Sequence, residues 1–138
     1  MNASQQVELG KLFFEDGIPG FSHLQFFQLM QEEESPFFIL QSTEEPDVGF
    51  WVVNPFSFFQ NYVFTLPDVS KEALRLTEEM PVAVLAIVTI RSRDEVTVNL
   101  KAPIVINLSN RMAKQVILQD EMYSIRQPLF AQQAAGSK

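Results

Sequence analysis

Hydrophobic and polar residues alternate along much of this chain with a period of two. Between residues 96 and 106 every even position is apolar, whereas the odd positions are mostly polar or proline. This pattern is typical of a strand with one buried face. Because proline cannot donate a ladder hydrogen bond, Pro103 predicts an edge or a bulge in that strand. Residues 82–90 are apolar at both parities and rich in β-branched side chains, which predicts a strand buried on both faces.

Further apolar stretches predict strands over residues 37–40, 48–53 and 115–118, with Trp51 in the core. The Gly-Ile-Pro-Gly sequence at 17–20 predicts a type II turn, in which proline precedes a glycine with positive φ. Two short helices are expected. One runs from an Asn-Pro cap at 54–55 through residue 59, and Ser70 weakly caps another over 70–80.

Many short strands with little helix predict a mostly β domain, either a closed barrel or a sandwich. The chain has 138 residues, of which 46% are hydrophobic and 20% charged, so it is long and apolar enough to bury one core. We expect residues 1–130 to form a single domain. Residues 131–138 are small and polar, and they predict a flexible C-terminal tail.

Charge and phenylalanine are distributed unevenly between the two halves. Twelve of the 13 Phe and ten of the 17 carboxylates precede residue 69, where Lys11 is the only basic side chain. Two interpretations stay open. The Phe residues could pack a core inside a solvated acidic rim, or they could anchor a basic partner within an acidic ring.

Little in the sequence supports catalysis. Cysteine is absent, His23 is the only imidazole, and the carboxylates stand side by side, as at 32–34, 44–45 and 78–79. An acid/base pair would have to converge from opposite sides of a cleft. We therefore expect a protein that is not an enzyme and that needs no cofactor and no metal.

The same composition limits the partners and the location. Scattered bases and a pI near 4.6 disfavour direct binding to nucleic acid or to an anionic membrane. The N-terminal residues lack the pattern of a signal peptide, and the absence of cysteine fits a reducing compartment. We expect a cytoplasmic protein that acts through protein partners.

The segment 54–62 is the strongest binding candidate, because it places four aromatic residues within one short turn: Phe56, Phe58, Phe59 and Tyr62. Such a turn cannot bury all four on one side, so at least one ring should be exposed or roof a groove. The alternative is that Phe56 and Phe59 plug an open end of the barrel.

Several ordered motifs carry a closer resemblance. They are GIPGF at 17–21, SPFFILQS at 35–42, NPFSFFQNY at 54–62 and NLKAPIVIN at 99–107. VLAIVTI at 84–90 and KQVIL at 114–118 support them. Together they resemble the FliW family of bacterial flagellar assembly factors over roughly residues 12–129. One departure is the short stretch before residue 13, which predicts a shortened or rearranged first strand.

The resemblance implies a small, closed or partly open, antiparallel β-barrel-like domain with one or two short helices. It also implies two protein partners, the basic RNA-binding regulator CsrA and flagellin. While flagellin holds the factor, CsrA represses flagellin translation. Once flagellin is exported, the freed factor binds CsrA and relieves that repression. We expect a monomer when the protein is free of partners.

The acidic turns and the aromatic segment are the candidate partner-binding residues. These are Glu32, Glu33, Glu44, Glu45, Asp47, Phe56, Phe58, Phe59 and Tyr62. Acidic side chains would complement a basic regulator, and an apolar groove near 56–62 would suit the helical ends of flagellin. The alternative function is a small-ligand or carbohydrate-binding barrel with a pocket beneath Phe56 and Phe59.

Overall fold

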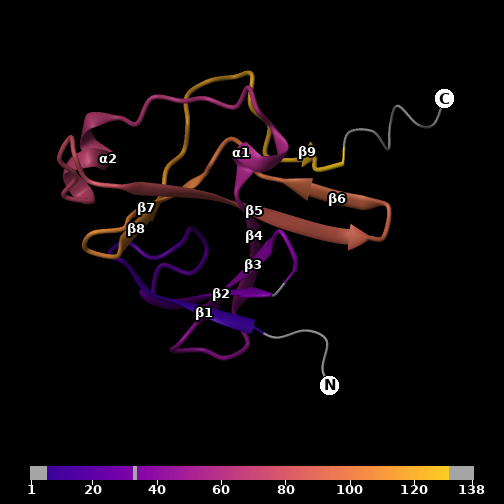
Figure 1. Cartoon of the computed structure of the whole chain (residues 1–138), viewed down its shortest axis with the longest axis horizontal. Coiled ribbons are helices and arrows are strands. Elements are labelled where there is room, and N and C mark those ends of the chain that lie inside the picture. Colours follow the sequence, from indigo (N-terminus) through magenta and orange to yellow (C-terminus); the bar gives the residue numbers. More distant parts are fainter. Residues whose placement is uncertain (1–5, 33, 131–138) are drawn as a thin grey trace.

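The computed structural model describes residues 6–32 and 34–130, and within them it has nine strands and two short helices (Figure 1). Glu33 and the predicted tail at 131–138 lie outside the described residues. The elements are β1 (Gln6–Phe14), β2 (Phe26–Glu32), β3 (Phe37–Ser42), β4 (Gly49–Val53), α1 (Pro55–Phe58), α2 (Asp68–Ala73), β5 (Val82–Ser92), β6 (Glu95–Val98), β7 (Ile104–Asn107), β8 (Met112–Gln115) and β9 (Gln127–Pro128). Neither helix in the described ranges is long and apolar enough to cross a bilayer.

Seven of the described strands close into a barrel. Their order is β4, β3, β2, β1, β8, β7 and β5, and β5 pairs with β4 to complete the ring. Neighbouring strands are antiparallel except β1 and β8, which run parallel at Phe13 and Phe14. The prediction of a mostly β, closed barrel with one or two short helices is confirmed.

β5 is the strand that connects the parts of the fold. Its residues 82–85 pair with β7, residues 86–88 with β4, and residues 88–92 with β6. In Figure 1 it crosses the middle of the molecule and continues with β6 into a projecting hairpin. The predicted burial of both faces is correct for the middle of β5. It is wrong at the two ends, where Val82 and Ile90 are exposed because no second layer formed by the described residues covers them.

The inner faces of the barrel strands form the first of two cores. Phe14 and Phe27 lie fully buried within it, with ring centroids 5.2 Å apart in an edge-to-face arrangement. Burial of each ring contributes about 2–3 kcal/mol of hydrophobic free energy. The inner core comprises Leu12, Phe14, Ile18, Leu24, Phe27, Leu29, Leu40, Val52, Leu85, Ile104, Ile106 and Ala113.

The second core lies on the outer side of the barrel wall. There the segment from α1 to α2 and the segment after β8 cover β5, β6 and β7. β5 and β7 therefore separate two apolar layers, which explains why both of their parities are hydrophobic. The outer core comprises Val53, Tyr62, Leu74, Ala86, Val88, Val96, Val98, Leu100, Val105, Met112, Val116, Leu118 and Leu129.

The predicted strand over 96–106 is wrong as a single element. The even positions are all buried, as the alternation predicted, but β6 ends at Val98 and β7 begins at Ile104. Between them, the Oδ1 atom of Asn99 accepts hydrogen bonds from the backbone N–H groups of Lys101 and Ala102. This local turn competes with the strand ladder, and Pro103 cannot restore it.

Other boundaries also differ from the sequence-based expectations. The helix expected over 70–80 is shorter and begins earlier: α2 ends at Ala73, with Leu74 as its C-cap, because the next residue, Arg75, adopts a positive φ of 57°. The strand expected over 115–118 ends at Gln115. Trp51 is not in the core but lies on the outer face of β4, 39% exposed. The first strand, β1, extends over nine residues.

Residues 15–25 connect β1 to β2 and close one end of the barrel. Ile18 and Leu24 enter the inner core, and the N–H of Phe21 donates to the carbonyl of Ile18. Pro19 and Gly20 occupy the centre of this turn, and the φ of 89° at Gly20 agrees with the predicted type II geometry. We refer to this end as the plugged end.

Gly17 should tolerate alanine much less well than Gly20. A Cβ atom at Gly17 would lie 2.6 Å from the Cα of Ser22 and 2.8 Å from the carbonyl oxygen of Phe21, and the φ of Gly17 is positive. At Gly20 a Cβ atom would meet no atom within 4 Å, so only the backbone strain remains. We expect Gly17→Ala to lower the free energy of unfolding in urea by about 2–3 kcal/mol, and Gly20→Ala by about 1 kcal/mol. Equal losses would contradict this arrangement.

Candidate functional site

The acidic candidate residues lie at opposite ends of the barrel. Glu32 ends β2 and precedes the turn to β3, whereas Glu44, Glu45 and Asp47 lie in the turn from β3 to β4. The six residues of β3 separate these turns by about 20 Å. Glu33 lies outside the described residues. The structure therefore does not combine the acidic candidates into one site.

Five carboxylates are gathered at the plugged end. Glu15 and Asp16 follow β1, and the β3–β4 turn contributes three more. We call the surface formed by these five residues the acidic end: Glu15, Asp16, Glu44, Glu45 and Asp47. All five are exposed. Lys114 approaches Asp16 at 3.2 Å. Within residues 6–32 and 34–130, no group of three or more potential ligands is arranged to hold a metal.

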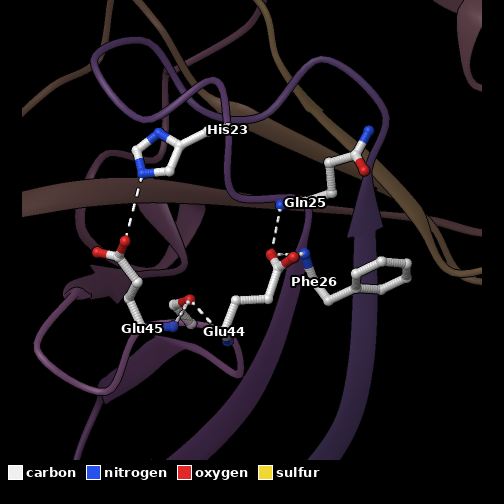
Figure 2. Close-up of polar contacts among 6 residues, drawn as sticks. His23, Gln25, Phe26, Glu44 and Glu45 are labelled. Atoms are coloured by element: carbon white, nitrogen blue, oxygen red, sulfur yellow. Dashed lines mark hydrogen bonds and ion pairs between the residues drawn. The ribbon is translucent and has the colours of Figure 1, made fainter.

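Glu44 holds the backbone of a neighbouring strand (Figure 2). Its Oε1 atom accepts hydrogen bonds from the N–H of Gln25 at 2.8 Å and from the N–H of Phe26 at 3.1 Å. The hydroxyl of buried Ser42 accepts hydrogen bonds from the N–H groups of Glu44 and Glu45. These bonds fix the turn beside the start of β2, so Glu44 acts as a positioning residue.

Glu45 and Asp47 are the two acids of this turn that remain accessible. Figure 2 shows the imidazole of His23 directed at the carboxylate of Glu45, with 3.5 Å between Nε2 and Oε2. Both side chains are more than half exposed, so their mutual attraction is weak in water. The pair therefore adds little to the stability of the turn.

The aromatic segment divides between packing and exposure. Asn54 caps α1, since its Oδ1 atom accepts the N–H of Phe56 at 2.9 Å. Phe58 and Phe59 are half-buried against the outer core, and Phe58 meets Phe130 edge to face at 6.2 Å. Phe56 is 42% exposed. Only one of the four rings is thus presented to a partner.

Tyr62 is buried and belongs to the outer core. Its hydroxyl donates to the carbonyl of Leu100 at 2.7 Å, and its ring contacts Tyr123 at a centroid distance of 4.8 Å. Burial, with a smaller contribution from Tyr123, raises the pKa of Tyr62 well above its ordinary value. Tyr123 in turn donates to the carbonyl of Val63 at 2.7 Å. The first of these hydrogen bonds joins the segment after α1 to the connection between β6 and β7, and the second joins it to the segment after β8.

A cavity of about 400 Å³ opens at the end of the barrel opposite the acidic end, and we call it the mouth cavity. Its wall includes inner-core side chains of β1, β2, β5 and β7. Four exposed apolar residues form its rim: Leu9, Phe56, Val82 and Leu108. Its polar side chains are Asn54 and Arg111. A neighbouring hollow of about 550 Å³ beside α2 shares Val82 with it.

Sequence reasoning found Phe56 but missed the other residues of this rim. Val82 is predicted only as a strand residue, and Leu9 and Leu108 belong to none of the predicted motifs. Periodicity indicates which face of a strand is apolar, but not where the barrel ends. The predicted plug is wrong for Phe59, which packs against the outer core. Phe56 lines the mouth cavity without closing it.

Comparisons with known proteins all find similarity to FliW proteins, and they do so over nearly the whole chain. The family model described as FliW protein matches residues 3–129. The flagellar assembly factor FliW of Caldicellulosiruptor saccharolyticus is 44% identical over 120 residues, which cover 86% of this chain and 79% of that protein. The same factor from a Geobacillus species is 44% identical over 123 residues, covering 88% and 85%. A crystal structure of the flagellar assembly factor FliW is 45% identical, covers 87% of this chain and 85% of its own, and has a TM-score of 0.83.

Glu44 and Glu45 should differ in their contribution to stability, although they are adjacent and both exposed. Glu44→Ala removes a charged acceptor from two backbone N–H groups, and we expect a loss of about 1–2 kcal/mol in the free energy of unfolding. Glu45→Ala should change it by less than about 0.5 kcal/mol. Urea denaturation of the two variants measures this difference. Similar losses for both would show that Glu44 does not hold the start of β2.

Proposed function

This chain belongs to the FliW family, and on that basis we propose that it is a flagellar assembly factor that switches between two protein partners. In this proposal it binds the translational regulator CsrA and antagonises the repression of flagellin synthesis. It also binds flagellin, which keeps it from CsrA until flagellin is exported. The resulting feedback loop couples flagellin synthesis to export.

The observation that carries this proposal is the extent of the similarity. The chain covers 85% of the solved FliW structure at 45% identity, so the shared part is nearly the whole factor and not one fragment of it. The relatives named flagellar assembly factor FliW are covered to a similar extent.

The acidic end supports an interaction with a basic regulator. Glu45 and Asp47 are exposed, and Glu15 and Asp16 extend the negative surface beyond the turn. Complementary charge of this kind accelerates encounter and favours one orientation of the partner. The acidic end is therefore the proposed docking surface for CsrA.

The mouth of the barrel supports an interaction with an apolar helical segment. Its rim presents Phe56 and three aliphatic side chains, and Val82 connects it to the hollow beside α2. An amphipathic helix could lay its apolar face along this surface. The mouth is therefore the proposed docking surface for flagellin.

The two proposed surfaces lie at opposite ends of the barrel and share no residue. Exclusion of one partner by the other would then require coupling between the ends, either through the bulk of flagellin or through a shift of the barrel. A carbohydrate-binding function is less well supported, since Asn54 and Arg111 are the polar side chains of the mouth cavity and a sugar needs many polar partners.

Charge reversal at the acidic end should slow association with CsrA. We expect Glu45→Lys combined with Asp47→Lys to lower the association rate about tenfold at low salt, and less at high salt, where screening removes the steering. Glu44 is left intact because it holds the start of β2. Stopped-flow mixing at two salt concentrations measures the effect.

The matched control is Glu78→Lys combined with Glu79→Lys, which changes the net charge equally at two other exposed carboxylates. If both double variants slow association alike, net charge acts without a localised site. If purified CsrA and flagellin both fail to bind the native protein, the assignment itself is wrong.

Truncation of Phe56 should weaken flagellin binding without unfolding the protein. Because Phe56 is partly exposed at the rim, Phe56→Ala should cost about 2 kcal/mol of binding free energy, as expected of an aromatic anchor. Phe26→Ala is the matched control, since Phe26 is 47% exposed but lies at the other end of the barrel. Calorimetric titration of each variant with flagellin distinguishes them. Equal losses would place the site away from the mouth.

A further inference from the structure

The mouth cavity has the features of a site for a small ligand. Its volume of about 400 Å³ lies within the range of small-molecule sites. From its lining we infer that it binds an aliphatic monocarboxylate, with the hydrocarbon chain inside the barrel and the carboxylate at Arg111. This site is separate from the acidic end, and it lies below the rim proposed for flagellin.

The depth of the cavity favours a slender apolar ligand. Leu12, Leu29, Leu85 and Ile106 line it, and all four are buried members of the inner core. A barrel of seven or eight strands has room for side chains or one small ligand inside it, whereas a helix is about 10–12 Å across. A protein helix could therefore rest only on the rim. A hydrocarbon chain could enter, and each buried CH₂ group would contribute about 0.8 kcal/mol.

Arg111 supplies the charge that selects a carboxylate. The guanidinium is held in place because its Nη2 atom donates to the carbonyl of Leu9, and the main chain of Arg111 is fixed by its backbone N–H, which donates to the carbonyl of Asn107. It lies against Gly10, where any side chain would collide with it. One of its two terminal nitrogens carries this bond, which leaves other N–H groups to bind a ligand.

No carboxylate of the described residues forms an ion pair with Arg111. Glu8, Glu32 and Glu34 belong to the same end of the barrel, yet none of them lines the cavity. A guanidinium beside an apolar cavity is complementary to a carboxylate on a hydrocarbon chain, since Arg binds carboxylates with two parallel hydrogen bonds. Asn54, the other polar side chain of the lining, adds an amide near the opening.

The test is a titration of the full chain with decanoate below its micelle concentration, followed by NMR of labelled methyl groups. We expect shifts at the methyl groups of Leu29, Leu85 and Ile106, and none at Leu118 of the outer core. Decanol, which lacks the carboxylate, should bind at least about tenfold more weakly, as expected for the loss of a charged hydrogen bond.

Variants separate the chain-binding and charge-binding parts of the site. Arg111→Asn should lower the affinity for decanoate about tenfold and leave the affinity for decanol unchanged. Asn is chosen because it tolerates the positive φ of 67° at this position. Lys114→Asn is the matched control, since Lys114 lies outside the mouth cavity. Ala83→Leu narrows the cavity and should abolish binding of both ligands, and it serves as the second test if the Arg111 variant fails to fold.

Three results would overturn the inference. One is the absence of methyl chemical-shift changes with decanoate. This result would mean that the cavity either receives an apolar side chain of a protein partner or binds no ligand. Another is a set of shifts confined to the outer core. The third is equal affinity for decanol and decanoate, which would exclude Arg111 as the group that selects the ligand.

Discussion

The pairing of β4 with β5 is the interaction on which the rest of the structure depends. It closes the barrel at three residue pairs, from Trp51 with Val88 to Val53 with Ala86. Without closure, both strands would present free edges and the inner core would be open to water. β5 can take part because its other edge binds β7 and β6 in turn, so that one strand serves the barrel, the outer core and the projecting hairpin.

Closure also gives the barrel two unlike ends. At one end the β1–β2 connection folds inward, and the exposed carboxylates of the acidic end lie around it. One of them, Glu44, holds the start of β2 through two hydrogen bonds. At the other end no segment of residues 6–32 and 34–130 covers the opening, and Phe56 and Val82 lie at the rim of an apolar cavity. The two ends therefore differ, although Glu8 and Glu32 lie at the mouth end and the exposed Phe26 lies at the acidic end. The function proposed above assigns a different partner to each of these ends.

Much of the fold could be predicted from local patterns, because those patterns reflect local physics. The Asn54 cap, the Pro19-Gly20 turn and the buried even positions from 96 to 106 depend on a residue and its immediate neighbours. The errors occur where distant segments decide. Trp51 is exposed because none of the described residues covers that part of β4, and α2 ends at Ala73, two residues before the positive φ of Arg75. The period of the hydrophobic pattern does not show whether another segment covers a strand, and it does not show where the chain reverses direction.

By itself the sequence determined the mostly β class, the resemblance to a family that implies a barrel, and the kinds of residue available for binding. These follow from alternation, turn chemistry and the order of the motifs, all of which are read along the chain. Only the tertiary structure decided that Glu44 is occupied by backbone N–H groups while Glu45 is accessible, although the two are adjacent. It alone brought the side chain of Arg111 to the carbonyl of Leu9 and placed Arg111 and Phe56 in the lining of the same cavity. The reason is that exposure and proximity depend on which strands meet when the ring closes, and closure joins residues that lie far apart in the chain.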